Sequence, residues 1–340
     1  MTALSGTDAL FTGGVTDPRD GPAAPLRVGV LGAAAGGVPH LRALAGGVPG
    51  ARVVLVQDDG DQRRLAELAE HAGATVARHP NEVVAADLDA VVVAGTDPVP
   101  VLFACLERGL PAYVEPRRLL DPDDVRALVS LEEALGRRLV QVGLTRRHDP
   151  AHLALRRSLV DGDVGRVRLV RSVERSQGLR SGLLPALDAL AWLLGLPPTS
   201  VRLTSEEPTL VTVRVGATLA RVEVDDHAPG GHEIRCEVLG SDGVTTLGAP
   251  PAVRVLARGS ASVGLPADAT ARFADATRIG LTAWVRSVRT GRALGASAWD
   301  WHVATTAAAA VAASRLEDRE VPVDPGPRPG LYDPVPHRAL

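Results

Sequence analysis

Three glycines that follow an apolar segment near the start of the chain have the spacing of a ligand-binding turn. Residues Leu26–Leu31 are typical of a buried strand, and the glycines after it are Gly32, Gly36 and Gly37. The N–H groups at such a helix start have no partners within the helix, and the helix dipole adds positive charge, so a diphosphate can bind there. Ala34 stands at the middle position of the dinucleotide pattern G-x-G-x-x-G, which is otherwise matched.

Asp58 supports a dinucleotide site. It directly follows a second β-type run, Arg52–Gln57, where a Rossmann unit places the acid that binds the ribose hydroxyls of the adenosine. Because a carboxylate repels a 2′-phosphate, the pattern predicts NAD rather than NADP. The alternative is that the turn is only a tight connection and Asp58 only a loop acid; the two features together favour the nucleotide site.

The chain contains no lysine, so all 37 of its basic residues are arginines. Schiff-base chemistry, a lysine acid or base and a Walker-type phosphate lysine are therefore excluded. Arginine cannot replace lysine in these roles, because its guanidinium stays protonated at any working pH.

Thr96 and Glu115 come directly after further strand-like runs. Thr96 follows the apolar run 88–94, and Glu115 follows the short run 112–114. Ligands of open α/β sheets bind outside the carboxyl ends of the strands. Thr96 and Glu115 are therefore predicted to contact the cofactor.

His148 is the candidate base, with Arg146 beside it. Histidine titrates near neutral pH, although a helix-cap or surface role is the simpler alternative for His148. Arg117 and Arg118, together with Arg146, have the donor geometry to bind a carboxylate or a phosphate. The alternative for Arg117 and Arg118 is a charged turn that faces solvent.

Other polar residues give weaker signals. His227 and His232 flank a Pro-Gly-Gly loop, but no acid or cysteine has a suitable spacing, so we expect a solvated loop and no metal site. Asp188 lies four residues before Trp192 in an apolar helical run. It is a candidate for a polar residue at the pocket wall or for a partner of a nearby arginine.

Composition narrows the class of protein. A length of 340 residues with 45% hydrophobic residues suits two domains with substantial cores, and a net charge of −3 gives no footprint for nucleic acid or an anionic membrane. Cys105 and Cys236 fit neither a metal site nor a disulfide framework. With no signal-like N-terminus or membrane-length apolar run, a cytoplasmic protein is expected.

The order of elements predicts two kinds of sheet. Strands alternate with helices up to about Thr145, which is typical of a doubly wound parallel Rossmann sheet. The second half carries successive strands, an apolar helix over 183–194, a long helix over 272–289 and a last helix opened by the capping-box spacing of Ser297 and Asp300. We expect a tail over 1–25, an NAD(P)-binding domain over 26–145, an α+β substrate and oligomerisation domain with an open-faced, mainly antiparallel sheet over 146–324, and a Pro-rich tail over 325–340.

This order resembles the GFO/IDH/MocA family of oxidoreductases. The stretches that carry the resemblance are Gly32–His40, Gly109–Glu115, Gly143–Pro150, Leu187–Gly195 and Gly295–Asp300, and the third and last are most similar to the inositol 2-dehydrogenase branch. The resemblance implies NAD(P) at the junction of the two domains and a substrate pocket near His148. It also implies that Trp299 lies near the cofactor and that the protein is a homodimer or homotetramer.

Three residues depart from the family pattern. The catalytic lysine of the Glu-Lys-Pro motif falls on Pro116, and the acid and histidine of the Asp-x-x-x-His motif fall on Ser181 and Pro185. The prolines cannot take a proton, and a serine must be activated by another group. The resemblance therefore implies hydride transfer to or from a small polyol, sugar or related cyclic metabolite only with a non-standard proton relay. The alternative is an inactive family member that acts as a binding or partner subunit.

Overall fold

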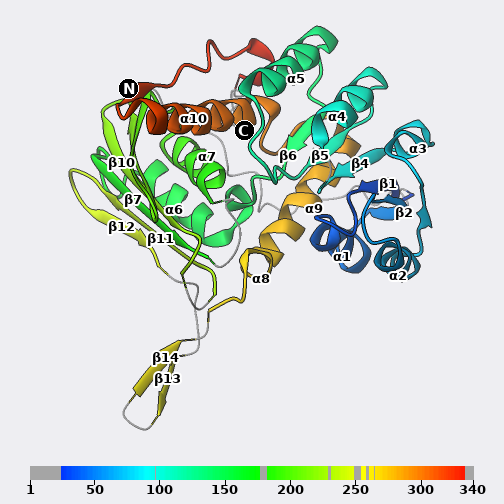
Figure 1. The fold of residues 1–340 in the computed structure, drawn as a ribbon, viewed down its shortest axis with the longest axis horizontal. Coiled ribbons are helices and arrows are strands. Elements are labelled where there is room, and N and C mark those ends of the chain that lie inside the picture. The colour runs from blue at the N-terminus through cyan, green and yellow to red at the C-terminus, as the bar shows by residue number, and fades with distance from the viewer. Residues whose placement is uncertain are drawn as a thin grey trace.

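Two sheets form the framework of the protein. The computed structural model describes residues 24–95, 97–176, 182–228, 231–248, 254–257, 260–263 and 265–333. Thr96 and Ser181 lie outside these ranges. In Figure 1 a six-stranded sheet lies on the right and a seven-stranded sheet on the left, with helices packed around and between them.

The six-stranded sheet is parallel throughout, with the strand order β3-β2-β1-β4-β5-β6. Its strands are β1 (Leu26–Leu31), β2 (Ala51–Gln57), β3 (Thr75–Val76), β4 (Ala90–Val93), β5 (Ala112–Val114) and β6 (Val140–Val142). The chain reverses its direction of travel across the sheet between β1 and β4, which is where such sheets bind ligands. The doubly wound Rossmann sheet predicted from the sequence is confirmed.

Helices cover both faces of this sheet. One face packs against α1 (Val38–Gly46), α2 (Gln62–Ala72) and α9 (Ala274–Thr290); the other packs against α3 (Pro80–Ala85), α4 (Pro98–Glu107), α5 (Pro122–Leu135) and the first half of α10 (Ala298–Glu317). Two of these helices come from the last third of the chain. Leu281 and Trp284 of α9 share a core with Val28 and Val30, and Trp301 of α10 shares the opposite core with β4 and β5.

The seven-stranded sheet has the order β12-β11-β7-β10-β9-β8-β15. Its strands are β7 (Leu169–Arg175), β8 (Ser200–Glu206), β9 (Thr209–Val215), β10 (Thr218–Asp225), β11 (Glu233–Leu239), β12 (Val244–Leu247) and β15 (Val321–Pro322). All neighbours are antiparallel except β7 and β10, so the mainly antiparallel α+β arrangement is confirmed. The inner face packs against α6 (Pro150–Val160), α7 (Leu183–Leu194) and the second half of α10.

The predicted start of the last helix, α10, agrees with the structure, but the predicted start of the helix before it does not. The capping box of α10 is confirmed, because Ser297 accepts a hydrogen bond from the Asp300 N–H and Asp300 accepts one from the Ser297 N–H. The predicted helix 272–289 is wrong at its start, because the backbone of Phe273 leaves helical geometry between α8 (Ala269–Arg272) and α9. This break buries the Phe273 ring against His152 and His232.

Two further segments complete the described chain. The hairpin of β13 (Arg254–Ala257) and β14 (Ser260–Val263) projects from the body of the protein (Figure 1). After β15 the chain returns to the six-stranded sheet and makes a short 3-10 turn, η3 (Gly330–Tyr332). Tyr332 is buried there and donates a hydrogen bond of 2.5 Å to Glu132 of α5.

Candidate functional site

The glycine turn joins β1 to α1 against the end of β4. Gly32 has a φ of 71°, and a Cβ at this position would lie 1.4 Å from the carbonyl oxygen of Ala94. Only glycine combines this backbone conformation with so close an approach. The turn is therefore held tightly against the strand that borders the ligand-binding edge.

Asp58 lies directly on this turn. Its carboxylate is buried, with 5% of the residue exposed, and Oδ2 accepts hydrogen bonds of 2.9 Å from the N–H groups of both Ala34 and Ala35. Oδ1 accepts one more, of 2.8 Å, from the Gly60 N–H. The glycine turn and Asp58, which together predicted a nucleotide site, are thus in contact. Ala34 and Asp58 are 24 residues apart in the sequence.

The other N–H groups of the turn are also bonded within the protein. Those of Gly32 and Ala33 donate to the Gln57 carbonyl, and those of Gly36 and Gly37 donate to the Gly32 carbonyl. All the N–H groups from Gly32 to Gly37 are therefore occupied. An anion that binds here must displace one of these bonds or find its donors on another segment.

A cavity of about 370 Å³ opens beside the turn, at the carboxyl ends of β4 and β5. Its lining residues are Gly95, Asp97, Pro98, Glu115, Pro116, Arg117, Arg118 and Trp301. Glu115 is half-buried, and its Oε2 lies 3.2 Å from Nε2 of His40, a buried histidine of α1. The cavity wall therefore carries the Glu115 carboxylate, which His40 contacts from the protein interior, and the side chains of two arginines.

Relatives of known name identify the family. Inositol 2-dehydrogenase 1 of Saccharopolyspora erythraea is 35% identical to this chain over 335 residues, which cover 90% of this chain and 99% of that protein. The chain belongs to the GFO/IDH/MocA family, in its inositol dehydrogenase-like branch. Inositol 2-dehydrogenase of Klebsiella pneumoniae is 32% identical over 333 residues, 90% of this chain and 99% of the relative. No protein-family model matches the chain.

Solved structures of the same branch have the same fold. The crystal structure of myo-inositol dehydrogenase from Lactobacillus casei, in complex with NAD(H) and myo-inositol, superposes with a TM-score of 0.82 at 25% identity. The match covers 91% of this chain and 99% of that one. The fold of the family is therefore preserved in this chain.

Pro116, where the resemblance places the family's lysine, lines the cavity beside Glu115. Pro185, where it places the histidine, lies in the first turn of α7. Among the described residues, no group of three or more His, Cys, Asp or Glu side chains is arranged to hold a metal ion. Nor does any helix within the described ranges combine the length and apolar character needed to cross a membrane.

His148 lies away from the cavity. It ends the 3-10 turn η2 (Thr145–His148) and is 3% exposed, and its ring packs on Gly280 of α9, where a Cβ would lie 2.9 Å from Cδ2. Neither ring nitrogen has a hydrogen-bond partner within the described part of the chain. Burial, with a smaller contribution from Arg147, lowers the pKa of His148 to about 4. The ring is therefore neutral at physiological pH, and it is not among the residues that line the cavity.

This lowered pKa predicts an acid-sensitive fold. Between the ordinary histidine pKa of 6.5 and about 4, the unfolded chain binds a proton that the folded chain excludes. Stability should therefore fall by about 3 kcal/mol as the pH drops from 7 to 4, at about 1.4 kcal/mol for each pKa unit. Urea unfolding of wild type and His148→Gln across this range measures the effect, since the variant should lack this component. His71→Gln, at an exposed position, is the control, and parallel pH profiles for wild type and His148→Gln would contradict the assignment.

Arg146 is committed to a partner in the second half of the chain. Its guanidinium forms a buried ion pair with Glu174 of β7, and Nε2 of His232 lies 3.6 Å from the other Glu174 oxygen. The expectation of a solvated loop is therefore wrong for His232, which is 1% exposed because it packs edge-on against Phe273. Arg146 also does not join Arg117 and Arg118 in the cavity lining.

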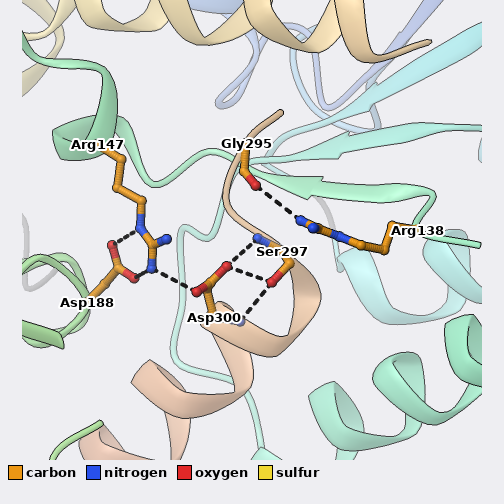
Figure 2. Close-up of polar contacts among 6 residues, drawn as sticks. All are labelled: Arg138, Arg147, Asp188, Gly295, Ser297 and Asp300. Atoms are coloured by element: carbon orange, nitrogen blue, oxygen red, sulfur yellow. Dashed lines mark hydrogen bonds and ion pairs between the residues drawn. The ribbon is translucent and has the colours of Figure 1, made fainter. Parts of the chain in front are cut away.

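Arg147 joins three elements through a second buried ion cluster. Its guanidinium bonds to both oxygens of Asp188 on α7, at 2.5 and 3.0 Å, and contacts Asp300 of α10 at 3.1 Å (Figure 2). Burial raises the pKa of Asp188. Burial also acts to raise the pKa of Asp300, but Arg147 and Ser297 outweigh it and hold that pKa at about 2. Of the two roles considered for Asp188, arginine partner is the one observed.

The tryptophan that borders the cavity is Trp301, whereas the resemblance indicated Trp299. Trp299, implied to lie near the cofactor, is buried between His302 and Arg126. Trp301, two residues later, borders the cavity instead. Its indole N–H is buried and has no acceptor among the described residues. The helical register of α10 explains the difference, since positions two apart face different directions.

Proposed function

We propose that the protein is an NAD-dependent oxidoreductase that transfers a hydride to or from a small polyol, sugar or related cyclic metabolite. Membership of the family supports this class of activity, and the named relatives include inositol dehydrogenases. The observation that carries the proposal is the buried Asp58 carboxylate, which lies on the glycine turn at the ligand-binding edge of the sheet. An acid at this point favours NAD over NADP.

The residues around the turn and cavity fit a dinucleotide. Asp58 would bind the adenosine ribose, since among the described residues its Oδ1 accepts one hydrogen bond, from the Gly60 N–H, and a carboxylate oxygen can accept two. Gly32 to Gly37, with Ala34, would lie along the diphosphate. Glu115 and Trp301 border the cavity, which would take the nicotinamide half. Thr96 lies outside the described residues, so its predicted contact with the cofactor stays a prediction. NAD supplies the hydride acceptor when bound.

We assign the proton relay to Glu115 and His40 rather than to His148. Glu115 lines the cavity, so its carboxylate can take a proton from a substrate hydroxyl or return one to a reduced C=N or C=C bond. His40 contacts the same carboxylate from the protein interior, and its ring nitrogen can donate a hydrogen bond to the carboxylate or accept one from the carboxylic acid. This pair would replace the lysine that the family places at Pro116.

A partner-subunit role is the second candidate. It is favoured by the fully occupied N–H groups of the glycine turn and by Pro116 at the lysine position. A homodimer or homotetramer through the open face of the seven-stranded sheet suits either role. On that face Leu169 pairs with Leu219 on one side and Leu239 on the other, which forms an apolar row across three strands.

Replacing Asp58 tests the NAD site. Asp58→Ala should weaken NADH binding about 5- to 150-fold, which corresponds to about 1–3 kcal/mol for leaving paired groups unsatisfied. The measurement is a fluorescence titration with NADH and, separately, NADPH, and Asp59→Ala at the exposed neighbouring acid is the matched control. Equal NADH affinity in wild type and Asp58→Ala would contradict the assigned role. No NADH binding to wild type up to millimolar concentration would favour the partner-subunit role.

A further inference from the structure

The side chain of Arg117 lies across the glycine turn. A Cβ built on Gly36 would be 2.6 Å from Cδ and 2.9 Å from Nε of Arg117, so the arginine occupies the space that a side chain at residue 36 would need. The same Cβ would lie 3.0 Å from Cα of Gly95. Arg117 therefore reaches from the loop after β5 to the turn after β1, and it lines the cavity on the way.

The turn itself has little capacity left for an anion. Each of its N–H groups from Gly32 to Gly37 already donates within the protein, and two of them are held by the negatively charged Asp58. A diphosphate that approached this backbone would meet occupied donors and a carboxylate of like charge. A cation on a neighbouring segment is therefore needed if an anion is to bind here.

Arg117 differs from the adjacent Arg118 in its availability. Arg118 forms an ion pair of 2.7 Å with Asp97. Within the described ranges, no carboxylate forms an ion pair with Arg117. A guanidinium offers planar paired donors that match phosphate oxygens bidentately. Of the two arginines that line the cavity, Arg117 is thus the one with donors to spare beside the turn.

We propose that Arg117 is the diphosphate-binding residue of the dinucleotide site, in place of the backbone N–H groups of the glycine turn. The inference rests on the proposed function, since it assumes that a dinucleotide binds. It accounts for the tolerance of Ala34, because a turn that does not cradle the diphosphate with its own backbone does not need a glycine there. It also gives Gly36 a specific role, which is to leave room for the arginine.

Binding of ADP and of adenosine to the full-length protein tests the assignment, by calorimetry at low and at physiological salt. Arg117→Gln should weaken ADP binding about 10- to 100-fold, the size expected for charge-assisted hydrogen bonds, and should leave adenosine binding unchanged. Arg118→Gln, the matched control, should change ADP binding less than about threefold because Asp97 already engages Arg118. The affinity of wild type for ADP should fall more steeply with salt than that of Arg117→Gln.

Gly36→Ala tests the same inference by a second substitution, again through the affinities for ADP and adenosine. The added methyl group would displace the Arg117 side chain, so ADP binding should weaken while adenosine binding persists. If wild type binds NADH but Arg117→Gln does not change the affinity for ADP, the inference is overturned and the proposed function still stands. If Arg117→Gln weakens ADP and adenosine binding equally, the inference is also overturned, because the substitution would then have disturbed the whole turn. Failure of wild type to bind NADH, ADP and adenosine would remove the proposed function as well.

Discussion

Replacing Arg147 with methionine is expected to lower the free energy of unfolding by about 3–5 kcal/mol, the usual cost of removing one partner of a buried ion pair. The Arg147 side chain is 13% exposed, and that of Asp188, which the guanidinium bonds through two nitrogens, is 2% exposed. Without Arg147, Asp188 becomes an unpaired acid among apolar side chains of α7. The change should also loosen the contact between η2 and α10, because Asp300 loses its partner as well.

Urea unfolding at pH 7 measures this loss, and two further variants locate its cause. Arg63→Met removes an arginine of similar length from an exposed i,i+4 pair with Glu67, and should cost less than 1 kcal/mol. Adding Asp188→Asn to Arg147→Met should restore part of the stability, because the buried charge is removed together with its partner. A loss below 1 kcal/mol for Arg147→Met alone would mean that water reaches Asp188.

Replacing Glu132 with alanine is expected to cost a similar amount, about 3–5 kcal/mol. Its carboxylate is fully buried and accepts hydrogen bonds from the N–H groups of Leu139 and Val140 and from the Tyr332 hydroxyl. Alanine would leave all three donors buried without an acceptor, at about 1–3 kcal/mol each before the structure relaxes. The carboxylate therefore links the end of α5, the start of β6 and the C-terminal 3-10 turn.

Urea unfolding of two further variants separates the contribution of the Tyr332 hydroxyl from that of the backbone N–H groups. Tyr332→Phe removes only the hydroxyl and should cost about 1 kcal/mol. Combined with Glu132→Ala it should add almost nothing, since the hydroxyl has then already lost its acceptor. Glu133→Ala at the exposed neighbouring position is the control and should stay within about 0.5 kcal/mol of wild type. Strict additivity of Glu132→Ala and Tyr332→Phe would show that the two groups act independently.

Much of the fold follows from local sequence patterns. The strand before Gly32, the strand before Asp58 and the capping box of Ser297 and Asp300 each depend on residues close together in the chain, and each was predicted correctly as a structural element. The break at Phe273 was not predicted, because the helical pattern continues through it. Burial of its ring against two distant histidines decides that geometry.

The site was harder to predict because its contacts span distant segments. Position after β6 made His148 a plausible base, but the small residue that receives its ring, Gly280, comes from a helix more than 100 residues later. The same holds for Arg117 on Gly36, and for Trp301, whose direction depends on the register of α10 against the sheet. Such contacts arise from tertiary packing, which no local pattern encodes.

The helices that close the six-stranded sheet also bear on how the chain folds as it is synthesised. Its last strand, β6, ends at Val142, but Leu281 and Trp284 of α9 and Trp301 of α10 still have to arrive to complete the two apolar faces. A nascent chain that has released only these strands and the helices between them therefore carries an uncovered hydrophobic surface while strands β7 to β12 of the second sheet are made. The order of translation thus exposes this Rossmann sheet to chaperones or to aggregation until α9 and α10 have left the ribosome.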